Sequence, residues 1–343
     1  ASGLVQRLAR VLSPLFTRLM PEVPPGHPAI SSMTLNLSAN VLGLDNAATP
    51  MGIKAMQDLQ TLNPRPEVAS NAQILFLVLN TSAVTLFPVT ILLYRAQMGA
   101  EDPAAVFVPI LIATSCSTLA GLLVTAWVQR IRLWDTVVLG FIGGAFAALL
   151  ALVGWFSTLG ADELQRQSSL ISNFLIIALI ILFLLVAHRK AVNVYEVFIE
   201  GAKSGFETAI GIIPYLLAML VAIGVFRASG ALDVLLDGLR AIVAAGGWDA
   251  RWVDALPTAL MKPLSGSGAR AMMIETMNNF GVDSFQGRLA ATVQGSTETT
   301  FYVLAVYFGS VGIRHARHAL ACGLAADFAG ITAAIAVAYW FYG

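Results

Sequence analysis

The stretch VVLGFIGGAFAALLALVGWF, residues 137–156, decides the class of fold. It contains no charged residue, and a helix needs about 20 apolar residues to cross the hydrocarbon core of a bilayer. A second uncharged run, NFLIIALIILFLLVA, covers residues 173–187. The whole chain of 343 residues is 57% hydrophobic and only 12% charged, whereas soluble domains carry about 25% charged residues. We therefore predict an all-α polytopic membrane protein.

Charges in the loops predict how these helices cross the membrane. The basic segments QRIR (129–132) and HRK (188–190) flank the two apolar runs, and the loop between the runs carries Asp162 and Glu163. Because cytoplasmic loops are enriched in Lys and Arg, both basic segments should lie in the cytoplasm and the acidic loop outside. The same reasoning, with a further span over residues 210–226, places the later basic loop IRHARH inside.

Three pairs of similar segments indicate that the chain contains two copies of one unit. The pairs are ASGL (1–4) with ASGA (228–231), LVLNTSAVTLFPV (77–89) with TVQGSTETTFYVL (292–304), and SCSTLAGLLVTAWV (115–128) with AADFAGITAAIAVAYW (325–340). The pairs follow one another in the same order, which favours duplication. The loop charges place corresponding segments on opposite sides of the membrane, so the sequence predicts two inverted-topology repeats, as in many secondary transporters.

The repeat also predicts the organisation of the chain into domains. We expect a first repeat over residues 1–129, connecting transmembrane helices over 130–192 and a second repeat over 193–343. In the second copy ASGA follows the predicted span 210–226, and the counterpart of that span before Ala1 is not in the sequence. We therefore expect further N-terminal helices of the same protein to precede this chain.

Four polar stretches interrupt otherwise apolar segments. They are NLSANVLGLDNAATPMG (36–52), VLNTSAVT (78–85), KPLSGSGAR (262–270) and QGSTETT (294–300). Non-helical backbone within a membrane persists only where it is buried in protein or lines a wet cavity. The ends of a broken helix carry unpaired N–H and C=O groups that can hold an ion or a polar solute. Ordinary surface turns, interhelical hydrogen bonds and a capped helix start at Ser296 or Thr297 are the structural alternatives.

Several of these motifs resemble known families. NLSANVLGLDNAATPMGIKAMQDLQ (36–60) is similar to the characteristic stretch of the spore maturation protein A family. The segments at 192–231, 262–277 and 295–320 resemble the spore maturation protein B family, so the chain resembles a fusion of the two that lacks the first helices of the A part. Both families carry the nucleoside-recognition, or gate, domain, which is similar to part of the concentrative nucleoside transporters and to a spore dipicolinate transporter.

This resemblance implies re-entrant hairpins and broken transmembrane helices near the midplane of a bacterial cytoplasmic (inner) membrane. It places hairpin tips at residues 46–49 and 265–268, and unwound segments at 80–82 and 296–299. The expected substrate-binding residues are Asn36, Asn40, Asp45, Asn46, Thr49, Asn80, Thr81, Ser82, Ser265, Gly266, Ser267, Gly268, Arg270, Ser296, Thr297, Glu298 and Thr299.

Glu298 is the strongest single candidate in the sequence. An ionisable residue inside a membrane is a functional candidate by default, and the repeat pairs Glu298 with Ala83, so the shared scaffold does not require a carboxylate there. It could bind a solute, accept a proton, or pair with Arg270 or Lys262. The alternative is a carboxylate near a helix start at the membrane surface.

Two classes of function remain open. The first is a transporter-like protein that binds or moves a small polar solute, nucleoside-like or an organic anion, with sodium or a proton as coupling ion. The second is a non-transporting scaffold or assembly partner, with homo-oligomers left open. An enzyme is not expected, because no nucleophile–base set is evident and Cys116 and Cys322 fit no metal spacing. We expect no cofactor and, without a basic block, no nucleic-acid partner; the lipid bilayer is the expected surrounding.

Overall fold

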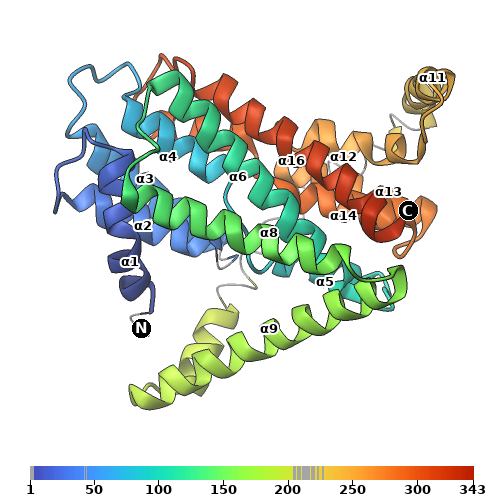
Figure 1. Cartoon of the computed structure of the whole chain (residues 1–343), viewed down its shortest axis with the longest axis horizontal. Coiled ribbons are helices and arrows are strands. Elements are labelled where there is room, and N and C mark those ends of the chain that lie inside the picture. The colour runs from blue at the N-terminus through green and yellow to red at the C-terminus, as the bar shows by residue number, and fades with distance from the viewer. Residues whose placement is uncertain are drawn as a thin grey trace.

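A computed structural model describes residues 4–41, 43, 45–203 and 228–343, together with single positions between 204 and 227. In these ranges the chain is helical, and its one β-type pairing is an isolated bridge between Val68 and His315 (Figure 1). This confirms the all-α prediction. The predicted span over 210–226 lies almost entirely outside the described residues.

The same order of elements occurs twice along the chain. The first repeat contains α1 (Leu4–Leu19), α2 (Pro28–Val41), α3 (Asp45–Gln60), α4 (Asn71–Thr81), α5 (Val89–Gln97) and α6 (Phe107–Gln129). The second contains α11 (Ala231–Ala245), α12 (Leu256–Met261), α13 (Gly266–Phe280), α14 (Phe285–Ser296), α15 (Thr300–Gly309) and α16 (Ala319–Tyr342). Each therefore comprises an amphipathic helix, a helical hairpin, a helix broken in two and a long helix. The boundaries of the domains as such remain a prediction.

Within the described residues, four helices are long and apolar enough to cross a membrane, so the protein is a multi-pass membrane protein. They are Pro103–Gln129, Thr136–Ser157, Glu163–Arg189 and Ala319–Tyr342. In the first and last of these spans, which include α6 and α16, 61% and 39% of the apolar part is buried. The span containing α8 (Gly144–Ser157) and the one formed by α9 (Ala161–Arg189) are each 6% buried. Hence α6 and α16 form the centre of the bundle, and α8 and α9 lie at its edge (Figure 1).

The two ends of the bundle differ in charge. At one end, the loop after α3 pairs with the loop after α15, because Ala69 N donates to His315 O (3.0 Å). This basic end carries Arg65, Arg130, Arg132, Arg314 and Arg317. At the other end, the loops after α5 and α13 meet, and this acidic end carries Glu101, Asp102, Glu163, Asp249 and Asp283. By the positive-inside rule we expect the basic end to face the cytoplasm, and this orientation remains a prediction.

The two hairpins enter the bundle from opposite ends. The α2–α3 hairpin has both outer ends at the basic end, and the α12–α13 hairpin has both outer ends at the acidic end (Figure 1). Each tip contacts the helix break of its own repeat: Leu86 N donates to Val41 O (2.9 Å), and Phe301 N donates to Pro263 O (3.0 Å). The two breaks also meet, since Glu298 N donates to Thr81 O (2.8 Å). The tips and breaks therefore form one central layer.

The structure corrects the predicted tip positions. Val41 ends α2 and Asp45 begins α3, so the predicted tip at residues 46–49 is the first turn of α3. The turn falls earlier because Gly43 has φ of +67°, and a Cβ at Gly43 would lie 2.2 Å from Phe87 O. Only glycine tolerates both conditions. In the second hairpin the turn covers residues 262–265, and the predicted residues after Ser265 belong to α13.

The breaks lie close to their predicted places. The helix α4 continues to Thr81, so Asn80 and Thr81 are helical and the unwound segment covers residues 82–88. The second break covers residues 297–299, and the proposed cap of α15 by Ser296 or Thr297 is wrong. Thr299 is the N-cap residue and makes no side-chain capping bond. Instead, Glu298 N of the second break donates to Thr81 O of the first repeat, and Phe301 N in the first turn of α15 donates to Pro263 O of the second tip.

Candidate functional site

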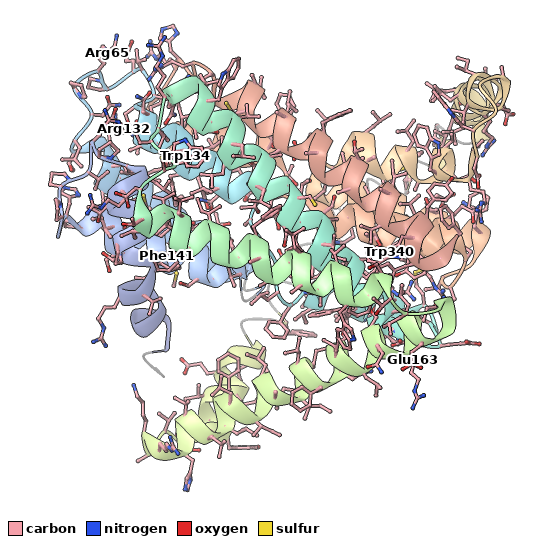
Figure 2. All side chains as sticks on the ribbon, viewed as in Figure 1. Arg65, Arg132, Trp134, Phe141, Glu163 and Trp340 are labelled. Carbon is pink, nitrogen blue, oxygen red and sulfur yellow. The ribbon has the colours of Figure 1, made fainter. Side chains whose placement is uncertain are left out.

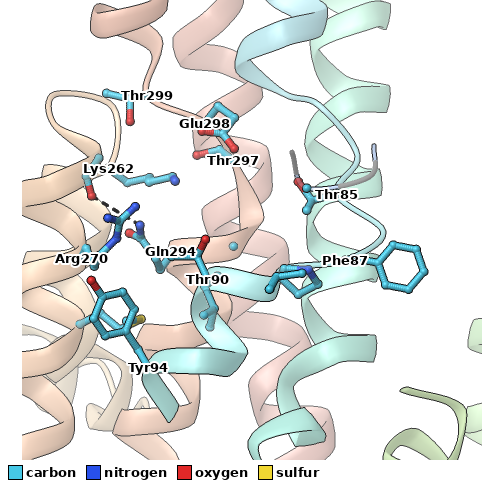
Figure 3. Close-up of a pocket in the computed structure, with 17 residues that line it drawn as sticks. Thr85, Phe87, Thr90, Tyr94, Lys262, Arg270, Gln294, Thr297, Glu298 and Thr299 are labelled. Atoms are coloured by element: carbon cyan, nitrogen blue, oxygen red, sulfur yellow. Dashed lines mark hydrogen bonds between the residues drawn. The ribbon is translucent and has the colours of Figure 1, made fainter. Parts of the chain in front are cut away.

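A cavity of about 80 Å³ lies where the two breaks and the two hairpin tips meet (Figure 3). The first repeat contributes residues of its break and of α5, and the second contributes residues of its tip, of α13 and of its break. The polar side chains at its wall are those of Thr85, Thr90, Tyr94, Lys262, Arg270, Gln294, Thr297, Glu298 and Thr299. Residues separated by about half of the chain therefore share one wall.

Two cationic side chains line the cavity. Lys262 follows α12 and is only 4% exposed, and Arg270 lies one turn into α13 with its guanidinium carbon 5.7 Å from the centroid of the Tyr94 ring. Figure 3 shows both side chains directed into the cavity. Among the residues that the structure describes, neither forms an ion pair with a carboxylate. Lys262 interacts electrostatically with the buried carboxylate of Asp327, and the half-buried Arg270 stacks on Tyr94. Because no salt bridge holds either cation, both can donate charge-assisted hydrogen bonds to an anionic ligand.

Further polar groups at the cavity lack partners. Gln294 is 6% exposed; its Nε2 reaches Gly266 O at 3.5 Å, and its Oε1 has no hydrogen-bond partner within the described part of the chain. The buried Thr297 Oγ1 forms no hydrogen bond of standard geometry there, although it lies close to the carboxylate of Asp327. Buried polar atoms are satisfied in most folded proteins. Unpaired groups beside a cavity therefore indicate hydrogen bonds that a ligand or water can complete.

The helix ends add to the positive potential. Three helices, α5, α13 and α15, begin at the cavity wall. Neither α5 nor α15 has a side-chain cap at its start, and helix N-termini carry a partial positive charge that favours anions. The opposing groups are the carboxylate of Glu298, the C-terminal carbonyls of α14 and, behind the wall, the buried carboxylate of Asp327, which interacts electrostatically with Lys262. Lys262, Arg270 and Glu298 together leave a formal charge of +1, from two cations and one anion.

The structure brings together only part of the predicted site. Gly266, Arg270, Thr297, Glu298 and Thr299 line the cavity. Asn36, Asn40 and Asn80 lie instead in a polar network between helices, and Thr81, Ser82 and Ser296 bond to carbonyls within their own helices. Ser265 caps α13 through Gly268 N (3.1 Å), with Ser267 beside it, and Thr49 lies in α3. The side chains of Asp45 and Asn46 are outside the described part.

The asparagine network joins the first repeat to α15. Asn40 Nδ2 donates to Asn80 Oδ1 (2.9 Å), and Tyr307 OH donates to the same oxygen (3.2 Å). Asn36 Nδ2 donates to Ala48 O (2.8 Å) and to Tyr307 OH (3.2 Å). Asparagine bonds of this kind hold membrane helices together. The arrangement favours packing over solute contact for these three asparagines, and their substrate role remains a prediction.

Sequence reasoning missed the residues that complete the cavity. Lys262 had a visible signal, because it is a lysine at the head of an interruption in an apolar segment. Thr90 and Tyr94 had none, because VTILLYR reads as an apolar helix, and only the crossing of α5 with the second repeat places them beside Arg270. In the described residues no group of three His, Cys, Asp or Glu side chains could hold a metal ion.

Comparison with known proteins agrees with this architecture. The Gate family, described as nucleoside recognition, matches residues 1–98 and 209–314. The chain belongs to the Gate family. Both matched stretches include the helices that form the cavity wall, and the unmatched middle contains α6, α8 and α9.

Two relatives each match part of this Gate-family chain. Spore maturation protein B of Bacillus subtilis (strain 168) is 49% identical over 154 residues, which is 45% of this chain and 85% of the relative. Spore maturation protein A of the same organism is 39% identical over 123 residues, which is 36% of this chain and 63% of the relative. The expected resemblance to both families is thus confirmed. No solved structure matches the chain.

Proposed function

We propose that the protein binds a small organic anion in the cavity between its two helix breaks and moves it across the bacterial inner membrane. The observation that carries the proposal is the pair Lys262 and Arg270, which line a central cavity and form no salt bridge with any residue that the structure describes. Their charge favours an organic anion over an uncharged nucleoside-like solute. The partly exposed Glu298 lies on the same wall and limits how much negative charge a ligand can carry.

The surroundings of the cavity suit transport because the two repeats also contact each other at both ends of the bundle. At the acidic end, Arg95 Nη2 bonds to Asp283 Oδ1 (2.7 Å). At the basic end, Arg314 N and His315 N both donate to Glu67 O (2.9 Å each). Movement of a solute would require these two contacts to open in turn, as in alternating access around a fixed central site. The tips and breaks would shift with the contacts because backbone bonds join them.

The first test is ligand-dependent thermal stabilisation of the purified full chain. The panel contains mono- and dicarboxylates, nucleosides and sodium chloride. A ligand at 100 times its Kd stabilises the folded state by about 2.7 kcal/mol, so a binding carboxylate should raise the Tm with concentration. Arg270→Gln should remove most of this shift, because a charge-assisted hydrogen bond contributes about 1.5–3 kcal/mol.

Arg251→Gln is the matched control. Arg251 is an exposed arginine that pairs with Asp249 (2.7 Å) and lies outside the cavity wall. It should leave the stabilisation unchanged. Uptake of the stabilising anion into proteoliposomes then separates transport from binding alone. A carboxylate shift that is equal in Arg270→Gln and wild type, or stabilisation by nucleosides only, would contradict the proposed anion site; binding without uptake would favour the non-transporting alternative.

A further inference from the structure

A second, apolar cavity opens between α1, α6 and α8. Its volume is about 370 Å³, and its wall is almost entirely aliphatic and aromatic. It is lined by Leu15 of α1, Leu37 of α2, Val84 of the first break, Leu119 of α6, and Phe141 and Phe146 on either side of Gly143. We call this cavity the apolar crevice. Phe141 belongs to a π-helical turn, Leu139–Gly143, which precedes α8, and such turns are frequent at functional sites.

A third cavity lies beside the crevice at the basic end. Its volume is about 480 Å³, and Leu19 lines both this cavity and the apolar crevice. Its wall includes Arg18, Arg130 and Arg132. We call it the basic mouth.

The charges of the basic mouth are not balanced by its carboxylates. Arg18 pairs with Asp135 (3.6 Å), and Glu22 Oε2 accepts a long hydrogen bond from Ala72 N (3.4 Å). Arg130 and Arg132 form no ion pair with any residue that the structure describes. Three arginines against two carboxylates leave a formal charge of +1. The mouth is therefore suited to an anionic group of modest size.

Two tryptophans place the mouth at the level of lipid headgroups. Trp127 and Trp134 are 81% and 87% exposed, and they lie within a few residues of Arg130 and Arg132. Figure 2 shows Trp134 and Arg132 at the same end of the bundle, with Phe141 further along toward the other end. Tryptophan is enriched where a membrane protein crosses the bilayer–water interface. The crevice thus extends from this interface into the hydrocarbon layer.

We propose that one anionic phospholipid occupies both cavities, with its phosphate at Arg130 and Arg132 and an acyl chain in the apolar crevice. A free anion would use only the mouth, whereas the adjoining apolar crevice suits a hydrocarbon chain. Basic pockets between membrane helices on the cytoplasmic side are suited to anionic headgroups. The wall of the crevice includes Ala83 and Val84 of the first break. A bound acyl chain would therefore contact the first break directly.

The test compares the full chain reconstituted in phosphatidylcholine alone with the full chain in phosphatidylcholine mixed with phosphatidylglycerol. Native mass spectrometry should detect a retained phosphatidylglycerol. The double variant Arg130→Gln/Arg132→Gln should bind that lipid about 30-fold more weakly, because each basic side chain near an anionic lipid contributes about fivefold. The variant Arg65→Gln/Arg314→Gln removes the same charge from the basic end outside the mouth, and it should retain the lipid.

A second variant tests the acyl chain without changing charge. Leu119→Trp narrows the crevice and should reduce lipid retention while all arginines remain. A photo-crosslinking residue in place of Phe146 should label lipid. The proposal would be overturned if both double variants lost lipid retention equally, or if inorganic phosphate stabilised the protein as much as phosphatidylglycerol does. A crosslink from position 146 to another segment of this chain or to a second copy would also overturn it. Because these measurements do not involve the central cavity, their failure is distinguishable from failure of the anion-transport proposal.

Discussion

The two repeats hold their helix breaks in different ways. In the first repeat, hydroxyl groups of α6 bond to the carbonyls of the break: Thr114 Oγ1 donates to Ala83 O (2.8 Å), and Thr118 Oγ1 donates to Ser82 O. In the second, the first residue of α15 bonds to a carboxylate of α16, since Thr300 Oγ1 donates to Asp327 Oδ2 (2.7 Å). Equivalent helix breaks therefore have neutral partners in one copy and an acidic partner in the other.

The charges of the central cavity show the same asymmetry. Lys262, Arg270 and Glu298 all come from the second repeat, whereas the first contributes the hydroxyls of Thr85 and Thr90 and the ring of Tyr94. A shared backbone plan thus carries different chemistry in its two copies. We infer that the second repeat determines which ligand binds, and that the first closes the wall around it.

The largest expected effect concerns the contacts between repeats. Arg95 is fully buried and donates to Asp283 Oδ1, Val282 O (2.8 Å), Asp102 O (3.2 Å) and Pro103 O (3.2 Å). Asp283→Ala should destabilise the protein by about 3 kcal/mol, because it leaves a buried guanidinium without its carboxylate. Arg317→Gln, at the exposed contact of the basic end, should cost under about 1 kcal/mol. Thermal unfolding of both variants in one detergent measures how much stability each loses. Equal losses of stability in the two variants would contradict the prediction.

Close packing of glycines gives the next comparison. A Cβ on Gly330 would lie 2.6 Å from Thr297 Cγ2 and 2.9 Å from Ser117 Cβ, whereas the nearest atoms to a Cβ on the repeat-related Gly121 lie at 3.0 Å. Gly330→Ala should therefore lower stability by about 1–3 kcal/mol. In Gly121→Ala the better helix propensity of alanine, about 1 kcal/mol, should offset most of the strain. The order of the two Tm values tests this; a less stable Gly121→Ala would contradict it.

Removal of the cavity carboxylate should sharpen the contrast between the repeats. Glu298→Gln raises the formal charge of the wall from +1 to +2, given Lys262 and Arg270. A carboxylate roughly 8 Å from a bound anion repels it by about 2 kcal/mol at an effective dielectric constant near 20. Anion affinity should therefore rise by about tenfold or more. Titration calorimetry measures it, with Thr85→Ala as an uncharged control; weaker anion binding would instead make Glu298 a direct ligand group.

The smallest effect concerns pH at the basic end. His318 Nε2 lies 3.0 Å from Gln129 Nε2, which makes the ring nitrogen the acceptor. Burial, and secondarily Arg317, lower the pKa of His318. The unfolded chain then binds the proton more readily, so stability should fall as pH drops below about 6.5, the usual value for histidine. His318→Asn should reduce this slope in Tm-versus-pH scans. His315→Asn removes one exposed imidazole as a control, and identical slopes for both variants would contradict the prediction.

Prediction from sequence succeeded where the signal was local. Apolar run length predicted the spans, and the polar stretches predicted both breaks to within a few residues. It failed at the hairpin tips, because the turn at Gly43 is fixed by its close approach to Phe87 O. Asn36 and Asn40, which the sequence assigned to a ligand, bond in the structure to Tyr307 and Asn80, and their substrate role remains a prediction. The partners of Asn36 are Ala48, 12 residues away, and Tyr307, far along the chain. Partners at such separations produce no local sequence pattern from which the bonds could be predicted.

The sequence by itself determined the membrane class and the repeated order of hairpin and broken helix. Hydrophobic length, glycine and proline act over a few neighbouring residues, so local sequence is enough to reveal these properties. Only the tertiary structure decided which polar side chains share a cavity. Tyr94 meets Arg270 because α5 crosses the second repeat, and the direction of each side chain depends on helix packing, which local sequence does not determine.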